Sequence, residues 1–204
     1  MSTDTITNNT TAAPPSGVCL PLDICNLALA RLGESPIPAI AQDGSPAARL
    51  CYMHYHPVRR EILCAHRWSF ATGLATLRSQ DTPDAESLKA HILPADCLRV
   101  LEVSTPRWTL RGRSIYCPAD CIRLLYIRDE EDTSLYEPHF IEAFATRLAC
   151  KLCIPLTSST TARDTLTQEY HRIALPQAAH FNAVQSASND FVPHHHRANK
   201  HGIL

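Results

Sequence analysis

The feature that most constrains the fold is a wide apolar stripe with helical spacing in the second half of the sequence. Its members recur every three or four positions and stop before Pro155: Phe140, Ile141, Phe144, Ala145, Leu148, Ala149 and Leu152. A helix with so broad an apolar face buries it in the centre of a core. We therefore predict a central helix over residues 136–155, around which the other elements must pack.

Two helices are expected before it. Asp23 is a candidate N-cap and Gly33 a candidate stop, which predicts a short amphipathic helix over residues 23–33. Ser45 is a second N-cap candidate, and an apolar stripe with helical spacing follows it, which predicts a helix over residues 45–66.

Prolines interrupt two of the helical patterns. Pro57 lies inside the segment 45–66, so either that helix kinks there or a second helix begins. A fourth helical pattern covers residues 160–185 and contains Pro176, where we expect a bend or an interruption. The sequence does not decide whether Pro57 kinks one helix or begins another.

Between residues 68 and 129 the period changes from that of helices to that of strands. The segments with β-type composition and alternation are Leu98–Val103, Trp108–Tyr116 and Cys121–Arg128. Gly112 marks a turn within the second segment, and the polar stretch from Ser79 to Lys89 predicts an exposed loop. The order of elements predicts an α+β fold, mainly a helical bundle of about four helices with an inserted small antiparallel β unit.

The two ends of the sequence have no apolar period. Residues 1–19 and 186–204 are therefore expected to be flexible arms on either side of one domain over residues 20–185. The net charge of −1 argues against tight general binding to nucleic acid or to anionic membranes. No apolar run reaches the roughly 18 residues of a membrane span and no export signal is seen, so we expect synthesis in the cytoplasm and no membrane partner.

The sequence contains none of the recurrent catalytic signatures of nucleotide, hydrolytic and metal-dependent enzymes. We therefore predict a protein that is not an enzyme and has no cofactor. Cys150 and Cys153 form the single Cys-x-x-Cys, which is only half of a zinc site. We interpret them as core cysteines. His54, His56 and His66 have no carboxylate-rich partner motif, so we interpret them as interface or capping residues and predict no metal site.

Basic residues gather in the predicted β unit. They are Arg107, Arg111, Arg113, Arg123 and Arg128. Arginines on one sheet can contact DNA phosphates or a protein interface, and they can equally form an ordinary solvated face. The sequence does not choose between these alternatives.

Several pieces of sequence follow one another with a characteristic order and spacing. They are Asn26–Gly33 with Ser35-Pro36-Ile37, Ala47–Cys51, Tyr55–Arg59, His66–Ala71, Leu93–Val100, and Phe140–Ala149 with Ile154–Thr157. In this order the chain resembles the tail tubular protein A family, the head-to-tail adaptors of short-tailed bacteriophages. The resemblance covers about residues 20–185. It departs from the family at His56, where the family usually has an acidic residue.

The resemblance implies a structural protein of the virion, made in the host bacterial cytoplasm and assembled in the neck of the phage. Its domain would join neighbouring copies in a ring, commonly of twelve, between the portal protein and a tail nozzle or other tail protein. The ring would continue the DNA channel, with transient and sequence-independent contact to passing DNA.

The C-terminal arm is the expected portal-docking segment, because an arm that folds on its partner can cover a large surface. Its candidate contacts are Phe191, Val192, Pro193, Arg197, Lys200, Ile203 and Leu204. Two other hypotheses remain at this point. One is a connector of a long-tailed phage, and the other, from a different class, is a small cytoplasmic enzyme or regulator that depends on Cys and His residues.

Overall fold

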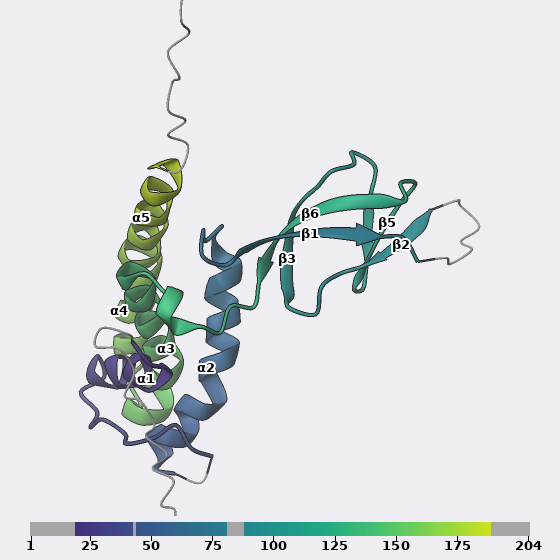
Figure 1. The fold of residues 1–204 in the computed structure, drawn as a ribbon. Coiled ribbons are helices and arrows are strands. Elements are labelled where there is room, and N and C mark those ends of the chain that lie inside the picture. The colour runs from purple at the N-terminus through teal and green to yellow at the C-terminus, as the bar shows by residue number, and fades with distance from the viewer. Residues whose placement is uncertain (1–18, 43, 81–87, 189–204) are drawn as a thin grey trace, which may run out of the picture.

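A computed structural model of the chain describes residues 19–42, 44–80 and 88–188. The chain has a helical body from which a β module extends to one side (Figure 1). The α+β fold is confirmed. The helices of the body are α1 (Pro21–Ala30), α2 (Pro46–Ala65), α3 (Pro138–Thr157), α4 (Thr160–Glu169) and α5 (Leu175–Ser188).

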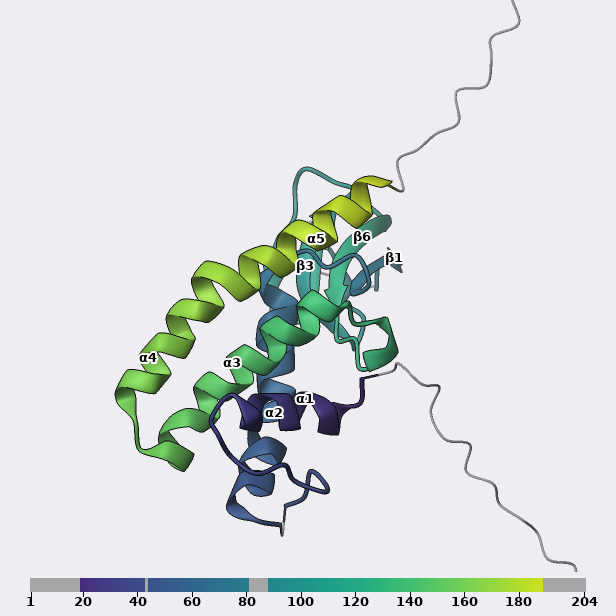
Figure 2. The same ribbon diagram turned by 90° about the vertical axis from the view of Figure 1, so that its left-hand side faces the viewer.

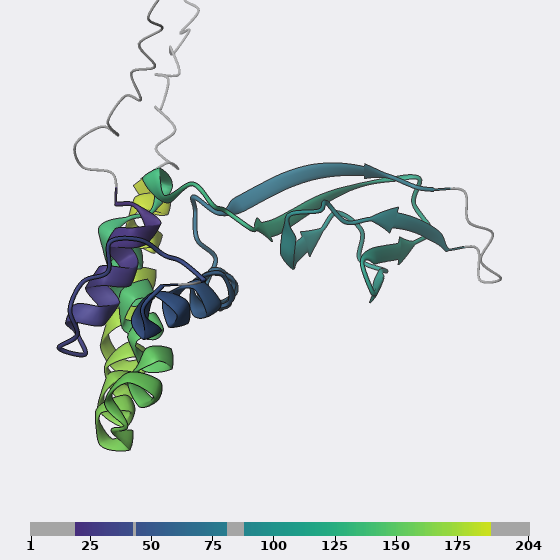
Figure 3. The same ribbon diagram turned by 90° about the horizontal axis from the view of Figure 1, so that it is seen from below.

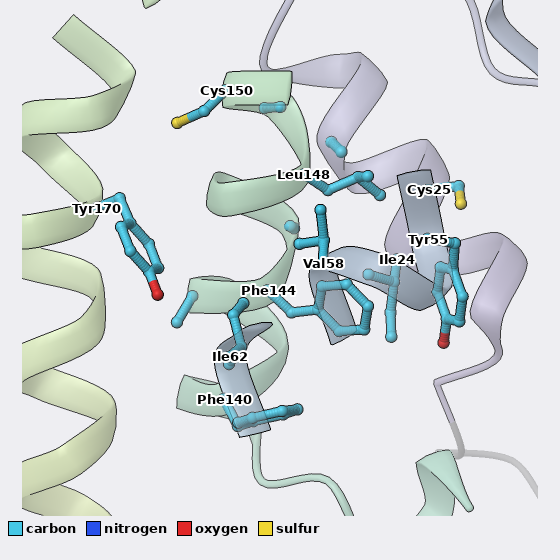
Figure 4. Close-up of a cluster of buried hydrophobic side chains, with 14 of the residues drawn as sticks. Ile24, Cys25, Tyr55, Val58, Ile62, Phe140, Phe144, Leu148, Cys150 and Tyr170 are labelled. Carbon is cyan, nitrogen blue, oxygen red and sulfur yellow. The ribbon is translucent and has the colours of Figure 1, made fainter. Parts of the chain in front are cut away.

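The predicted central helix is α3, which contacts α1, α2, α4 and α5 (Figure 2). Phe140, Phe144 and Leu148 on its apolar face are fully buried. They pack against α2 residues such as Val58 and α1 residues such as Ile24 (Figure 4). The helix continues two residues past Pro155 to Thr157, and its C-cap residue Ser158 adopts a left-handed conformation with φ of 54°.

Helix α1 begins earlier than predicted, because Asp23 lies in its first turn and is not its N-cap residue. The helix starts at Pro21, and the Asp23 carboxylate instead accepts the backbone N–H of Leu20 at 2.8 Å. This bond satisfies an N–H at the helix start, and the charge suits the positive end of the helix dipole. Gly33 then adopts a positive φ of 73° after the last turn, as a chain leaving a helix often requires.

Neither Pro57 nor Pro176 ends a helix. Helix α2 runs unbroken through Pro57, where Pro57 and Met53 are both exposed, so water can satisfy the Met53 carbonyl that loses its donor. Before Pro176 the chain widens into a π-helical turn, Tyr170–Ala174, between α4 and α5. The wider turn gives the proline ring room against the preceding carbonyl, and α5 continues to Ser188, three residues past the predicted end of the domain.

The β module consists of two antiparallel sheets of three strands each. The first has the order β1-β6-β3, from β1 (Thr72–Arg78), β6 (Cys121–Arg128) and β3 (Cys97–Val103), and the second the order β2-β5-β4, from β2 (Lys89–Ile92), β5 (Ser114–Cys117) and β4 (Thr109–Arg111). The long strands β1 and β6 leave the helical body together (Figure 3). Strands β3 and β6 and the β4–β5 hairpin match the predicted segments. Strand β1 lies in the predicted β region before the expected loop, where no strand bounds were predicted. Strand β2 was not predicted, and Lys89 begins it rather than ending the loop, of which residues 81–87 lie outside the described residues.

The two sheets enclose a core of their own, separate from that of the helices. Its buried residues are Leu93, Cys97, Val103, Ile115, Cys117, Ile122, Leu124 and Tyr126. Gly73 in β1 makes room for Tyr126, because a Cβ at Gly73 would lie 2.8 Å from that ring. Ile127 at the base of β6 belongs instead to the helical core, so the β module is anchored to the helical body at its base.

Candidate functional site

The predicted arginines do not form one cluster, because they lie in different strands and turns of the β module. Arg128 lies at its base, where its Nη2 donates to the Phe70 carbonyl at 3.1 Å and pairs with Glu130 at 2.5 Å. Arg113, in the β4–β5 turn, donates to the carbonyls of Pro94 and Ala95. These two arginines hold the main chain in place and have a structural role in the fold.

Three arginines remain on the surface. Arg107 lies in the exposed loop between β3 and β4, and Arg111 on β4 lies 5.2 Å from the ring centre of Tyr116. Arg123 lies on the outer face of the β1-β6-β3 sheet. There it borders an open hollow of about 430 Å³ together with Leu74, Glu102, Ser104 and Leu125. This hollow is a shallow surface and not an enclosed catalytic cleft.

Large apolar side chains are exposed on both faces of the β module. Leu74, at the centre of β1 beside the hollow, is 72% exposed, and Ile92, Trp108 and Leu110 are exposed on or beside the second sheet. On the helical body, Ile173, Phe181 and Val184 are exposed near and along α5. Apolar side chains gathered on a surface are typical of faces that another protein covers. We therefore consider these faces the candidate assembly surfaces.

A buried ion-pair network joins the helical body to the β module. Arg59 of α2 is only 1% exposed, and its Nη2 donates to Asp129 at 2.8 Å and to Glu131 at 2.6 Å, just after β6. Arg60 donates from its Nε to the other Asp129 oxygen at 2.8 Å. Hydrogen bonding to Arg59 holds the pKa of Glu131 below its ordinary value. The network fixes the end of β6 against α2.

The C-terminal end of α2 is also tied to the β module. The indole Nε1 of the fully buried Trp68 donates to the Ile62 carbonyl at 2.8 Å, and Arg99 of β3 donates to the Cys64 carbonyl at 2.6 Å. Both carbonyls lie in the last turn, where the helix leaves its acceptors unpaired. The positive charge of Arg99 also suits the negative end of the helix dipole.

Asn182 of α5 completes this junction. Its Oδ1 accepts the Ser69 N–H at 2.8 Å and its Nδ2 donates to the Arg67 carbonyl at 2.9 Å, while the residue is 2% exposed. In the segment between α2 and β1, one main-chain N–H and one main-chain carbonyl thereby receive hydrogen bonds from a side chain more than a hundred residues later in the sequence. Asn182 was not predicted as a functional residue, since its one signal in the sequence is a polar residue beside the apolar stripe of the last helix.

The cysteines and histidines lie in separate places. Cys25, Cys51, Cys150 and Cys153 are buried in the helical core, as predicted for core cysteines. A hydrogen bond between the Cys25 and Cys51 thiols, followed by burial, raises the pKa of the Cys25 thiol. Within the described ranges, no group of three or more His, Cys, Asp or Glu residues is placed to hold a metal ion.

The candidate histidines are on or near α2. Burial, followed by the charge of Lys151, lowers the pKa of His54. Burial, followed by the charge of Arg99, lowers the pKa of His66, whose ring lies 5.0 Å from that of Trp68. His56 is exposed and makes an edge contact with Tyr55. These positions suit contacts at the surface and at the junction rather than convergence on one ligand.

The candidate portal-docking residues Phe191, Val192, Pro193, Arg197, Lys200, Ile203 and Leu204 lie outside the described residues. The structure describes no helix with the length and apolar character needed to cross a membrane in residues 19–42, 44–80 and 88–188. In comparisons with known proteins, neither a family model nor a curated sequence matches the chain.

Proposed function

We propose that this chain is a non-enzymatic structural protein of a tailed bacteriophage, the head-to-tail adaptor that forms a ring between the portal and the tail. The observation that carries the proposal is the projecting β module, which has its own core and is fixed at its base by the Arg59 network. A subunit of this shape presents different surfaces to its two neighbours. Head-to-tail contacts between different surfaces close into a ring when the rotation per subunit divides a full turn.

The exposed apolar positions suit such lateral contacts. Leu74 lies on the β module and Phe181 on α5, so a neighbouring copy could cover either face. The order of sequence motifs that resembles the tail tubular protein A family supports the same function and favours about twelve copies. The portal protein and a tail nozzle or other tail protein are then the partners above and below the ring, and the virion neck is its location.

Passing DNA could meet exposed arginines of the β module. Arg107 and Arg123 are exposed and are candidates for brief phosphate contacts, whereas Arg113 and Arg128 already bind main-chain carbonyls. A near-neutral chain with isolated surface arginines allows DNA to slide without tight or base-specific binding. This agrees with a channel wall better than with a DNA-binding regulator.

The decisive experiment is quantitative mass spectrometry of purified particles, which counts this chain against the portal protein. We expect a ratio of about one, as a matched ring requires. Absence from the particle would refute the proposal. A second experiment uses mass photometry of the full chain mixed with portal protein: Leu74→Asp should reduce ring formation, while the matched variant Leu135→Asp, at an exposed leucine outside the β module, should not.

The DNA contact has its own test. Arg107→Gln combined with Arg123→Gln should reduce the slope of log binding constant against log salt by about 2, because each phosphate contact contributes about one unit. Arg113→Gln serves as the control, since Arg113 is bonded to the main chain. An unchanged slope in the double variant would exclude these two arginines from DNA contact.

A further inference from the structure

A polar pocket of about 490 Å³ lies where the end of α2, the start of β1 and α5 meet (Figure 1). His66, Arg67 and Ser69 line it from the segment between α2 and β1, and Asn182 and Ser186 line it from α5. None of the side chains that line the pocket is acidic. The proposed adaptor function assigns no role to this pocket.

The backbone around the pocket is held in place by the buried side chain of Asn182. Its amide accepts the N–H of Ser69 at 2.8 Å and donates to the carbonyl of Arg67 at 2.9 Å, so both side chains start from fixed main-chain positions. On α5, the Ser186 hydroxyl donates to the Asn182 carbonyl at 2.8 Å. The pocket is therefore part of the folded junction, as is usual for ligand sites.

Three donor groups of the pocket have no hydrogen-bond partner within the described ranges. They are the guanidinium of Arg67, the imidazole of His66 and the hydroxyl of Ser69. By contrast, Arg99 of β3 already donates to the Cys64 carbonyl. Arg67 and Ser69 are exposed and His66 is partly exposed, so a ligand in the pocket can reach all three.

The charges around these donors favour an anion. Burial, followed by the charge of Arg99, lowers the pKa of His66, so the imidazole is neutral at pH 7 and can donate from one ring nitrogen. The π-helical turn and α5, residues 170–188, contain no Asp or Glu. No carboxylate among the residues that line the pocket offsets the charge of Arg67, and a concave surface with one sign of charge attracts the opposite ion.

A phosphate monoester suits this set of donors better than a carboxylate or a phosphodiester. It offers three free oxygens to an arginine, a ring N–H and a hydroxyl, whereas the other two groups offer only two. Arginine binds phosphate through paired N–H donors. The pocket also has room for part of the molecule to which the phosphate is esterified.

We propose that this pocket binds the phosphate group of a phosphate monoester, which accepts hydrogen bonds from the Arg67 guanidinium, the His66 ring and the Ser69 hydroxyl. The site is independent of ring assembly, because all three donors belong to one chain and one folded junction. Both a small phosphorylated molecule and the phosphorylated 5′ end of a DNA strand carry such a group, and the test separates these two sources.

The first measurement is an NMR titration of the isolated full chain, labelled with ¹⁵N, with inorganic phosphate at constant ionic strength. We expect saturable shifts of the backbone N–H signals in residues 66–72 and 182–186. Arg67→Gln should weaken the binding at least about tenfold, as expected for the loss of hydrogen bonds to a charged group. Arg172→Gln, at an exposed arginine of the π-helical turn outside the pocket, is the matched control and should leave the binding unchanged.

Further probes identify the ligand. Thymidine 5′-monophosphate should bind at least as tightly as inorganic phosphate, while acetate and the dinucleotide thymidylyl-thymidine, whose phosphate is a diester, should bind more weakly. Tighter binding of a 5′-phosphorylated oligonucleotide than of the monophosphate supports a DNA end as the source. Equal binding supports a small phosphorylated molecule.

The absence of saturable shifts, or phosphate binding that Arg67→Gln and Arg172→Gln weaken equally, would overturn the proposal. Acetate or the dinucleotide binding as tightly as phosphate would overturn it too. Arg67 is exposed and its side chain makes no hydrogen bond or ion pair among the described residues, so Arg67→Gln should stay folded, which its remaining NMR signals verify. A failure here leaves the proposed adaptor function untouched, because the composition of the particle tests that function separately.

Discussion

Replacing Arg59 with methionine tests whether the ion-pair network holds the β module to the helical body. The Arg59 side chain is 2% exposed, and the Arg59→Met substitution keeps most of its aliphatic stem while removing the guanidinium. Asp129, 12% exposed, then loses one of its two arginine partners, and Glu131 loses its bond to Arg59. The change therefore leaves a largely buried carboxylate partly unpaired.

The size of the effect follows from these exposures. Removing one partner of a buried ion pair costs about 3–5 kcal/mol, and the low end applies because Arg60 still holds the second Asp129 oxygen. Glu131 is 65% exposed and its pair with Arg59 adds little. We expect a loss of about 3 kcal/mol in the free energy of unfolding, which lowers the melting temperature by about 6–12 °C for a domain of this size.

Urea unfolding followed by circular dichroism measures this loss. Arg60→Met is the matched control, because Arg60 binds the same carboxylate but its side chain is 57% exposed, so the expected loss is at most about 1 kcal/mol. Combining Arg59→Met with Asp129→Asn should recover part of the loss, since the unpaired charge is then removed. If Arg59→Met costs no more than Arg60→Met, the network does not hold the junction.

Three further predictions concern the same junction. Trp68→Phe removes the bond to the Ile62 carbonyl and leaves a small cavity, so urea unfolding should show a loss of about 2 kcal/mol; an unchanged midpoint would contradict this. Asn182→Ala removes two main-chain bonds, so hydrogen exchange should accelerate in α5 and in the segment after α2, and unaltered protection there would disprove the role of Asn182. Because Arg59 lowers the pKa of Glu131 from 4.5, the stability from this carboxylate is complete above about pH 4.5 and is lost as the pH falls through the lower folded value. Melting temperatures from about pH 7 to about pH 3 should therefore fall less steeply in Glu131→Gln than in the unaltered chain, and identical slopes would refute the linkage.

Local patterns predicted the helices well where a buried face repeats over several turns. The stripe that contains Phe140, Phe144 and Leu148 identified α3 and its central place, because only burial explains so broad an apolar face. The prolines were harder to interpret. The effect of Pro57 depends on whether water reaches the carbonyl one turn earlier, and that is a property of the packed surface.

The candidate site was only partly predictable. The five arginines share one stretch of sequence and one residue type, yet Arg113 and Arg128 bind main-chain carbonyls while Arg107 and Arg123 face outward. Sequence composition cannot separate these roles, because they depend on which loop or helix lies opposite each side chain. The four-residue strand β2 was missed because so few residues carry too little periodicity to stand out.

The sequence by itself determined the α+β class, the central helix, the insertion of the β unit between helices and the burial of the Cys150–Cys153 pair, because each depends on hydrophobic periodicity along a continuous segment. Tertiary structure alone decided that the strands form two sheets around a second core, and that Arg59 meets Asp129 across seventy residues. These features join segments far apart in the chain. Their pairing energy depends on geometry and burial that no local pattern encodes.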